Sequence, residues 1–330
     1  MNRQEQITSW LSQVMGQAPS ELTLAASDAS VRQYWRARWP ERTAIVMDFD
    51  PAAFSAEPFV QRQAQLAGAG VAVPQLHAHA PELGLVLLED LGDVTLAQVL
   101  NEENAKGWYL RAIHDLIQLQ AHTLDEGLPV FDAAFIQREL DICKEWYIGQ
   151  QFGHTLTATE EKIWAHSCQL LQREILLQPT VFMHRDYHCR NLMVQGEALR
   201  VIDFQDAVKG PVAYDLVSLL RDAYVTWNEA FVLDLAIRYW EQAREAHLPV
   251  QEDFADFYRA FEMAGLQRHI KILGLFARLN LRDGKPQYLA DQPRVFEYVR
   301  QVCLRYRELT PLGRLLLNLH GTPVESGFTF

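Results

Sequence analysis

Apolar positions in the first hundred residues follow helical spacing in some stretches and strand spacing in others. Ile7, Trp10, Leu11 and Val14 recur every three or four residues, which predicts a short N-terminal helix. Apolar runs bounded by turn residues predict strands over 31–38 and 43–49 with a turn at 40–42, a strand after 71–74, and a buried strand over 84–89. A helix is expected over 58–69, with Pro58 near its first turn and with Gly68 and Gly70 at its end.

After Gly92 the pattern becomes mostly helical. Apolar residues recur at helical spacing over 108–123, 133–147 and 159–177, and helices resume after a β interruption between Thr180 and Asp203. This change predicts an α+β chain with a lobe boundary at Gly92. We expect a small lobe with a mixed β-sheet over 1–92 and a larger, mostly helical lobe over 93–330.

Composition narrows the class of protein. Hydrophobic residues make up 49% of the 330 positions, enough for a sizeable core. A formal net charge of -12 argues against a nucleic-acid-binding protein, which is usually basic. The four cysteines form no CxxC pair, which argues against a disulfide scaffold or a zinc ribbon. No apolar run approaches the roughly 20 residues of a membrane span, so we expect a cytoplasmic protein without membrane or nucleic-acid partners.

The β interruption carries the candidate chemistry. It reads His184-Arg185-Asp186, then four residues, then Asn191, a strand, a turn at Gly196, a second strand and Asp203 followed by Phe. A hairpin with its turn at Gly196 brings Asn191 and Asp203 back together, with Asp186 in the loop just before. Two carboxylates and a carboxamide are hard oxygen ligands suited to Mg²⁺ with substrate phosphates. The order and spacing are those of phosphoryl transfer in kinases.

These residues carry a family resemblance. The chain resembles, over nearly its whole length, the aminoglycoside-phosphotransferase-like small-molecule kinases, which are relatives of choline kinases with a protein-kinase-like two-lobed fold. The segments 87–92 and 210–216 share in the resemblance. More narrowly, 27–36, 145–147 and 265–274 are similar to the anomeric sugar kinases that phosphorylate N-acetylmuramate and N-acetylglucosamine at carbon 1 in peptidoglycan recycling.

The resemblance implies a role for each residue of the motif. Asp186 would orient and deprotonate the acceptor hydroxyl, while Asn191 and Asp203 would hold Mg²⁺ on the phosphates of ATP, the co-substrate. His184 and Asp215 would support the catalytic loop, Asp215 by accepting hydrogen bonds from its backbone. From the residues alone, Asp186 is also open to interpretation as a loop cap and Asn191 as a turn residue.

The nucleotide site departs from the family pattern. By resemblance, the backbone of Glu89 to Leu91 would meet the adenine edge. The family also places a phosphate-binding Lys on the third strand, but there is no Lys before residue 106, and Met47 occupies the expected position. No Gly occurs between 17 and 67, so a glycine-rich phosphate loop is absent as well.

Arginine is the expected substitute for this lysine. We predict that Arg32, or alternatively Arg36, reaches the phosphates from the turn that precedes it. The small residues Ala29 and Ser30 would let backbone amides approach the phosphates. If no arginine takes the place of the lysine, we expect this lobe to bind nucleotide weakly.

Two further groups are candidates for the acceptor. Trp146 and Tyr147 would stack on a sugar face, although aromatic residues at helical spacing are as readily core residues. Arg268, His269 and Lys271 would meet the lactyl carboxylate of N-acetylmuramate, or else form a solvated helix face.

The function expected is therefore an ATP- and Mg²⁺-dependent sugar 1-kinase whose partners are the sugar and ATP, with no protein partner implied. A kinase of another small hydroxyl compound, such as an aminoglycoside, choline or homoserine, is the alternative within the enzyme class. A nucleotide-binding pseudokinase is the alternative outside it, suggested by the missing lysine. A protein kinase is not expected, because the chain lacks an activation loop and an Ala-Pro-Glu motif.

Overall fold

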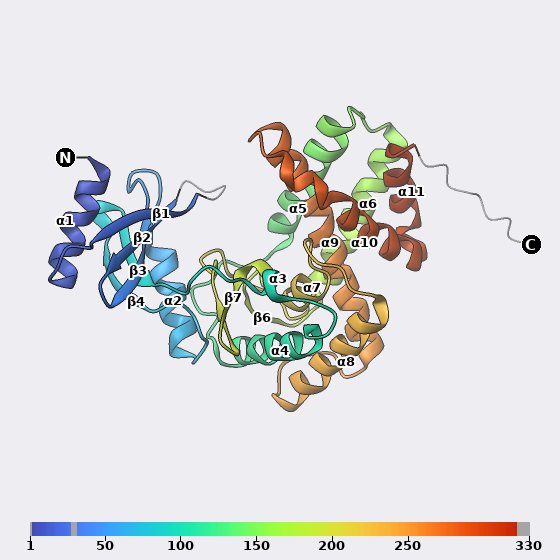
Figure 1. Cartoon of the computed structure of the whole chain (residues 1–330). Helices are drawn as coiled ribbons and strands as arrows, with labels where there is room; N and C mark the ends of the chain where they lie inside the picture. The colour runs from blue at the N-terminus through green and yellow to red at the C-terminus, as the bar shows by residue number, and fades with distance from the viewer. Residues whose placement is uncertain (1, 28–31, 322–330) are drawn as a thin grey trace, which may run out of the picture. The chain divides into compact units, whose positions relative to one another are not determined.

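An antiparallel five-stranded sheet dominates the N-terminal part of the chain (Figure 1). The computed structural model describes residues 2–27 and 32–321. Strand order in the sheet is β1-β2-β3-β5-β4. The elements in this part are α1 (Arg3–Met15), β1 (Glu21–Ser27), β2 (Gln33–Trp39), β3 (Arg42–Asp48), α2 (Glu57–Gly68), β4 (Leu76–Ala80), η1 (Pro81–Leu83), β5 (Leu85–Glu89) and α3 (Leu96–Val99).

The remaining described chain is mostly helical. It contains two short β-ladders, β6 with β9 and β7 with β8. Its elements are α4 (Ala105–His122), α5 (Ala133–Ile142), the π-helix η2 (Cys143–Gln151), α6 (Ala158–Leu176), β6 (Thr180–Met183), η3 (Cys189–Asn191), β7 (Leu192–Gln195), β8 (Ala198–Val201), β9 (Val208–Pro211), α7 (Tyr214–Leu220), α8 (Glu229–Glu245), α9 (Phe254–Leu281), η4 (Pro286–Ala290), α10 (Gln292–Arg305), η5 (Arg307–Leu309) and α11 (Thr310–Leu319).

The α+β class predicted from the sequence is confirmed, with two corrections in the sheet. All four strand pairings are antiparallel, so the sheet is not mixed. The pairs β2–β3 and β4–β5 are joined by short turns, and a short turn can join only antiparallel neighbours. Strand β1 was not predicted because Leu24 is exposed and Leu22 only half-buried at this sheet edge, so the apolar alternation is weak.

Packing divides the described residues into two compact units. Unit 1 is drawn from Met1–Arg111, His122–Leu124 and Arg190–Ala207, and unit 2 from Ala112–Ala121, Asp125–Cys189 and Val208–Phe330. The β7–β8 hairpin joins unit 1 through backbone hydrogen bonds from Val201 to Ala72 and from Val194 to Val94. These units describe packing, whereas the functional division into 1–92 and 93–330 stays a prediction.

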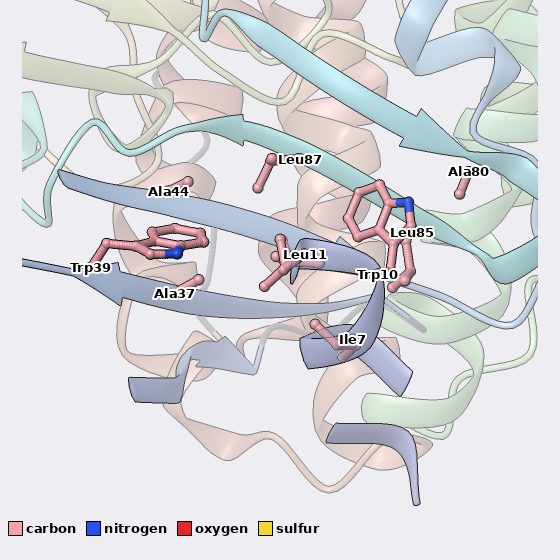
Figure 2. Close-up of a cluster of buried hydrophobic side chains, with 10 residues drawn as sticks. Ile7, Trp10, Leu11, Ala37, Trp39, Ala44, Ala80, Leu85 and Leu87 are labelled. Carbon is pink, nitrogen blue, oxygen red and sulfur yellow. The ribbon is translucent and has the colours of Figure 1, made fainter. Parts of the chain in front are cut away.

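The core of unit 1 lies between α1 and one face of the sheet. Helix α1 starts at a capping box, in which the Asn2 side chain accepts from the Glu5 amide and the Glu5 side chain accepts from the Asn2 amide. Its apolar face packs on alternate residues of β2, β3 and β5, which share one face because strand side chains alternate (Figure 2). The buried cluster consists of Ile7, Trp10, Leu11, Ala37, Trp39, Ala44, Val46, Ala80, Leu85 and Leu87.

Unit 2 is organised around α9, which packs against α5, α6, α7, α8 and α10 (Figure 1). The helix has 28 residues and is buried on all sides over its central turns, charged residues included. Gly274 lets it approach the π-helix η2, because a Cβ at this position would lie 2.5 Å from backbone atoms of Cys143 and Ile142. The helix predicted over 133–147 thus continues as η2, where the Phe152 amide donates to the Tyr147 carbonyl five residues back.

None of the helices in the described residues is long and apolar enough to cross a membrane.

We expect Gly274→Ala to lower the free energy of unfolding by about 1–3 kcal/mol, because the added methyl group overpacks a backbone contact. Urea unfolding measures this change. Gly68→Ala is the matched control, since nothing lies within 4 Å of a Cβ there and alanine is the better helix former. Equal stability of wild type and Gly274→Ala would contradict the close approach of α9 to η2.

Candidate active site

A buried carboxylate holds the loop that follows β6. Asp215, in the first turn of α7, accepts from the His184 amide at 2.7 Å and from the Arg185 amide at 2.9 Å. Burial raises the pKa of Asp215 to about 6, while the hydrogen bonds from these two amides act in the opposite direction. Arg185 has a φ of 76°, which L-residues rarely adopt. The loop is therefore held in a specific, strained conformation that begins at the end of β6.

Asp186 follows in this loop and is surrounded by cations. Its Oδ1 accepts from Arg268 Nη1 at 3.1 Å. Burial opposes ionisation, but Lys271 and Arg268 outweigh it and hold the pKa of Asp186 well below its usual range. The Asp186 side chain is 38% exposed, so a solute can reach the carboxylate. Asp186 is thus an ionised, accessible hydrogen-bond acceptor at neutral pH.

Glu139 of α5 balances the positive charge beside Asp186. Its carboxylate accepts from Arg185 Nη2 at 2.6 Å and from Gln267 Nε2 at 2.9 Å, and it lies 3.1 Å from the Lys271 ammonium. Glu139 was not predicted as a site residue. Its position on the apolar face of α5, together with Ile136 and Leu140, could have indicated that it is buried. A charged residue on an apolar helix face requires a partner.

The hairpin brings two of the predicted metal ligands together within unit 1. Asn191 ends η3 and donates from Nδ2 to Asp203 Oδ2 at 3.5 Å, and the Ile202 amide donates to the Asn191 carbonyl. Asp203 has a φ of 65° and a side chain that is 44% exposed, and its Oδ1 accepts from Gln205 Nε2 at 2.8 Å. An amide and an exposed carboxylate are a suitable donor pair for Mg²⁺, which keeps several waters.

The third predicted member of the site lies in the other unit. Asp186 belongs to unit 2, whereas Asn191 and Asp203 belong to unit 1. Convergence of all three side chains therefore stays a prediction. Within the described ranges there is no cluster of three or more His, Cys, Asp or Glu residues suited to a metal ion.

The two candidate replacements for the missing lysine have different surroundings. Arg32 Nη2 lies 3.9 Å from Asp203 Oδ1, and its guanidinium lies over the Phe54 ring. Arg36 instead donates two hydrogen bonds to Asp90 and two to Asp93, so both edges of its guanidinium are engaged. Arg36 therefore holds the segment after β5, and Arg32 is the better candidate for phosphate. Ala29 and Ser30 lie outside the described residues.

The segment predicted to meet the adenine edge lies at the end of β5. The Glu89 amide donates to the Gln75 carbonyl, and the Glu89 carboxylate accepts from the Gln75 amide and lies 3.6 Å from Arg200. Leu91 is buried. Met47, at the position expected for lysine, is fully buried in β3. Contact of the adenine edge with the backbone of Glu89 to Leu91 stays a prediction.

The two aromatic candidates differ in exposure. Tyr147 is fully buried, its hydroxyl lies 2.7 Å from His320 Nε2, and its ring packs edge-on against Phe152. These contacts fit the core alternative and not a sugar platform. Trp146, beside it in η2, is half-buried and stays a candidate.

Two of the histidines discussed above are buried. The expectation of a cationic His269 is not supported, because the ring is fully buried, donates from Nε2 to the Arg221 carbonyl and stacks on Tyr298. Burial lowers the pKa of His269 to about 3, which keeps it neutral. His184 is also fully buried, and its Nδ1 accepts from the Asp186 amide, which suits the predicted support role.

Comparison with known proteins gives a consistent result. A family model described as the phosphotransferase enzyme family matches residues 21–250. The N-acetylmuramate/N-acetylglucosamine kinase of Neisseria meningitidis is 44% identical, over 100% of both chains. A kinase with the same name from Pseudomonas putida is 42% identical over 96% of both chains.

Solved structures show the fold. Choline kinase LicA from Streptococcus pneumoniae superposes with a TM-score of 0.66 at 13% identity, covering 90% of this chain and 99% of that one. The ADP-bound aminoglycoside phosphotransferase APH(2'')-Ib gives 0.61 at 14% identity, covering 89% and 97%. These likenesses confirm the protein-kinase-like fold predicted from the sequence.

We expect Arg36→Met to lower the free energy of unfolding by about 2 kcal/mol at pH 7, because it leaves the buried Asp90 carboxylate without its cationic partner. The pKa values of Asp90 and Asp93 are lowered by Arg36, so this stabilisation exists above their usual pKa near 4 and is lost as the pH falls further. Denaturant titrations at pH 7 and pH 3.5 measure the difference.

Arg38→Met is the control on the same strand. Arg38 pairs with Glu21 at the surface, where an ion pair contributes about 1 kcal/mol at most. A wild-type advantage over Arg36→Met that grows at acid pH would contradict the assignment.

Proposed function

Because this chain belongs to the phosphotransferase enzyme family, we propose that it transfers the terminal phosphoryl group of ATP to the anomeric hydroxyl of N-acetylmuramate and N-acetylglucosamine. The observation that carries the proposal is 44% identity, along the whole length of both chains, to an N-acetylmuramate/N-acetylglucosamine kinase. The acceptor is a small molecule and ATP is the co-substrate. We place the reaction in the cytoplasm, where ATP is available, and in peptidoglycan recycling.

Asp186 serves as the acceptor for the proton of the sugar. Its carboxylate is ionised at neutral pH and accessible to a solute. In the transfer, the sugar oxygen bonds to the γ-phosphorus while the bond to the β,γ-bridging oxygen breaks, ADP leaves, and the hydroxyl proton passes to Asp186. A carboxylate stabilised by cations is a weak base. This suits an anomeric hydroxyl, which is more acidic than an ordinary alcohol.

Asn191 and Asp203 are the residues that would hold Mg²⁺. Their amide and carboxylate oxygens match its ligand preference, and nearly half of the Asp203 side chain is open to solvent. When bound, the ion neutralises charge on the phosphates during transfer. These separate roles for Asp186 and Asn191 are compatible with the length of chain between them, which is only four residues.

The nucleotide is assigned to residues 1–92 and the catalytic and acceptor residues to 93–330, although the β7–β8 hairpin of this second range packs in unit 1. Arg32 would contact the phosphates from beside Asp203. The backbone of Glu89 to Leu91 would meet the adenine edge.

We expect purified protein with ATP and Mg²⁺ to phosphorylate N-acetylglucosamine and N-acetylmuramate, with the phosphate on carbon 1 in ³¹P and ¹³C NMR spectra. Asp186→Asn should lower kcat by about 10²–10⁴-fold, the usual contribution of a general base. The control is Asp234→Asn, which alters an exposed ion pair with Arg238 on α8 and should leave kcat unchanged.

A panel with choline, homoserine and an aminoglycoside separates the other kinase activities. Phosphate on another hydroxyl, or transfer only to another acceptor, contradicts the proposed substrate. ATP binding without transfer to any acceptor indicates a pseudokinase.

We expect Arg32→Ala to raise the KM for ATP by about tenfold, the effect of losing a charge-assisted hydrogen bond of roughly 1.4 kcal/mol, with little change in the KM for the sugar. Initial-rate kinetics with each substrate varied measure both constants. Arg42→Ala is the matched control, because Arg42 also lies over an aromatic ring, that of Trp39, but is exposed at the turn between β2 and β3. An unchanged KM and kcat for ATP in Arg32→Ala would show that Arg32 does not contact the phosphates.

A further inference from the structure

We propose that Arg268 is a positioning residue for the transfer: its guanidinium holds one oxygen of the Asp186 carboxylate and the carbonyl of Arg185, so that Asp186 meets the acceptor hydroxyl in one fixed orientation. The inference rests on the proposed function, in which Asp186 takes the hydroxyl proton. Arg268 therefore acts through Asp186 and not on the substrate.

The contacts of Arg268 define this role. Nη1 donates to the Arg185 carbonyl at 2.6 Å and to Asp186 Oδ1 at 3.1 Å, so one nitrogen ties the side chain of Asp186 to the backbone of the preceding residue. The same carbonyl also accepts from Ser218 Oγ at 3.3 Å. The carboxylate and the peptide group before it are thus held together by one buried cation.

The position of Arg268 is itself rigid. It lies in the fully packed middle of α9, its side chain is 3% exposed, and its guanidinium lies over the Tyr214 ring. Burial and this ring contact limit the orientations open to the guanidinium, so its two Nη1 contacts are held in place.

Arg268 is distinct from the other cations near Asp186. Arg185 and Lys271 both pair with Glu139, whereas Arg268 pairs with Asp186 itself. The charged and titratable groups that face Asp186 or this cluster from the loop, α5, α7 and α9 include His184, Arg185, His188, Glu139, Tyr214, Asp215, Arg268 and Lys271.

The burial of Arg268 also bears on its predicted role as a ligand for the substrate carboxylate. A side chain that is 3% exposed, with its Nη1 engaged by Asp186 and the Arg185 carbonyl, is barely open to a solute. The structure therefore favours action on Asp186 over action on the lactyl group.

The test compares Arg268→Met and Arg268→Lys with Arg221→Met. Arg221 is a close match: it is 4% exposed, it lies 3.1 Å from the Glu262 carboxylate, and its guanidinium lies over the Phe261 ring. We expect Arg268→Met to lower kcat about 10²-fold, the effect of a misplaced reacting group, with the KM for ATP within twofold. Arg268→Lys should recover part of kcat, because lysine keeps the charge but not the planar guanidinium. Arg221→Met should lower the melting temperature without changing kcat.

A second readout does not require turnover. In ¹³C-detected titrations of carboxyl-labelled protein, with the Asp186 signal assigned by its loss in Asp186→Asn, the pKa of Asp186 should rise by about one to three units in Arg268→Met. The Asp186 carboxylate must be ionised to act, so any acid limb of kcat/KM should move to higher pH in the same variant. If Arg268→Met does not fold, the same measurements on Arg268→Lys test the proposal.

Three results would overturn the proposal. One is a raised KM for N-acetylmuramate but not for N-acetylglucosamine, which would make Arg268 a ligand for the lactyl carboxylate. The second is an unchanged kcat with only a lower melting temperature. The third is an equal loss of kcat in Arg221→Met. Failure of wild type to phosphorylate either sugar counts against the proposed function instead, and the titration of Asp186 remains as an independent test of Arg268.

Discussion

The buried carboxylate of Asp215 is the interaction on which the rest of the candidate site depends. It accepts the amides of His184 and Arg185 at the point where β6 ends, and it stabilises a left-handed backbone conformation at Arg185. Without an acceptor, one buried and one partly buried amide would remain unsatisfied. The direction in which Asp186 leaves the loop follows from this anchoring, and so does the placement of the Arg185 carbonyl that Arg268 contacts.

Charge compensation is the second constraint. Helix α9 brings Arg268 and Lys271 into the interior of unit 2, where isolated cations are strongly disfavoured. Glu139 and Asp186 are the carboxylates that offset them. The ion pairs that stabilise these buried cations also keep Asp186 ionised. One cluster therefore provides both the charge compensation that folding requires and the ionised carboxylate that catalysis requires.

Local patterns were sufficient for much of the fold. Periodicity located α4, α5 and α6 to within a few residues, because amphipathic helices carry their own signal, and Pro58 with the glycines at its end located α2. The edge strand β1 was missed because an exposed edge strand needs little apolar alternation, and the π-helix η2 because its sequence does not differ from that of an α-helix. For the site, the turn at Gly196 was enough to predict that Asn191 and Asp203 meet, since a hairpin is a local structure.

By itself, the sequence determined the order of the motif residues. It also determined the α+β class and the pairing across the hairpin, because helices, strands and hairpins form between near neighbours in the chain. Only the tertiary structure decided that His269 and Tyr147 are buried, that Arg36 pairs with Asp90 and Asp93, and that Glu139 and Arg268 belong to one charged cluster connected through Arg185. Those outcomes depend on which helix faces pack together. Glu139 and Arg268 are 129 positions apart. The residues next to a charged side chain on one helix do not indicate which other helix will pack over it.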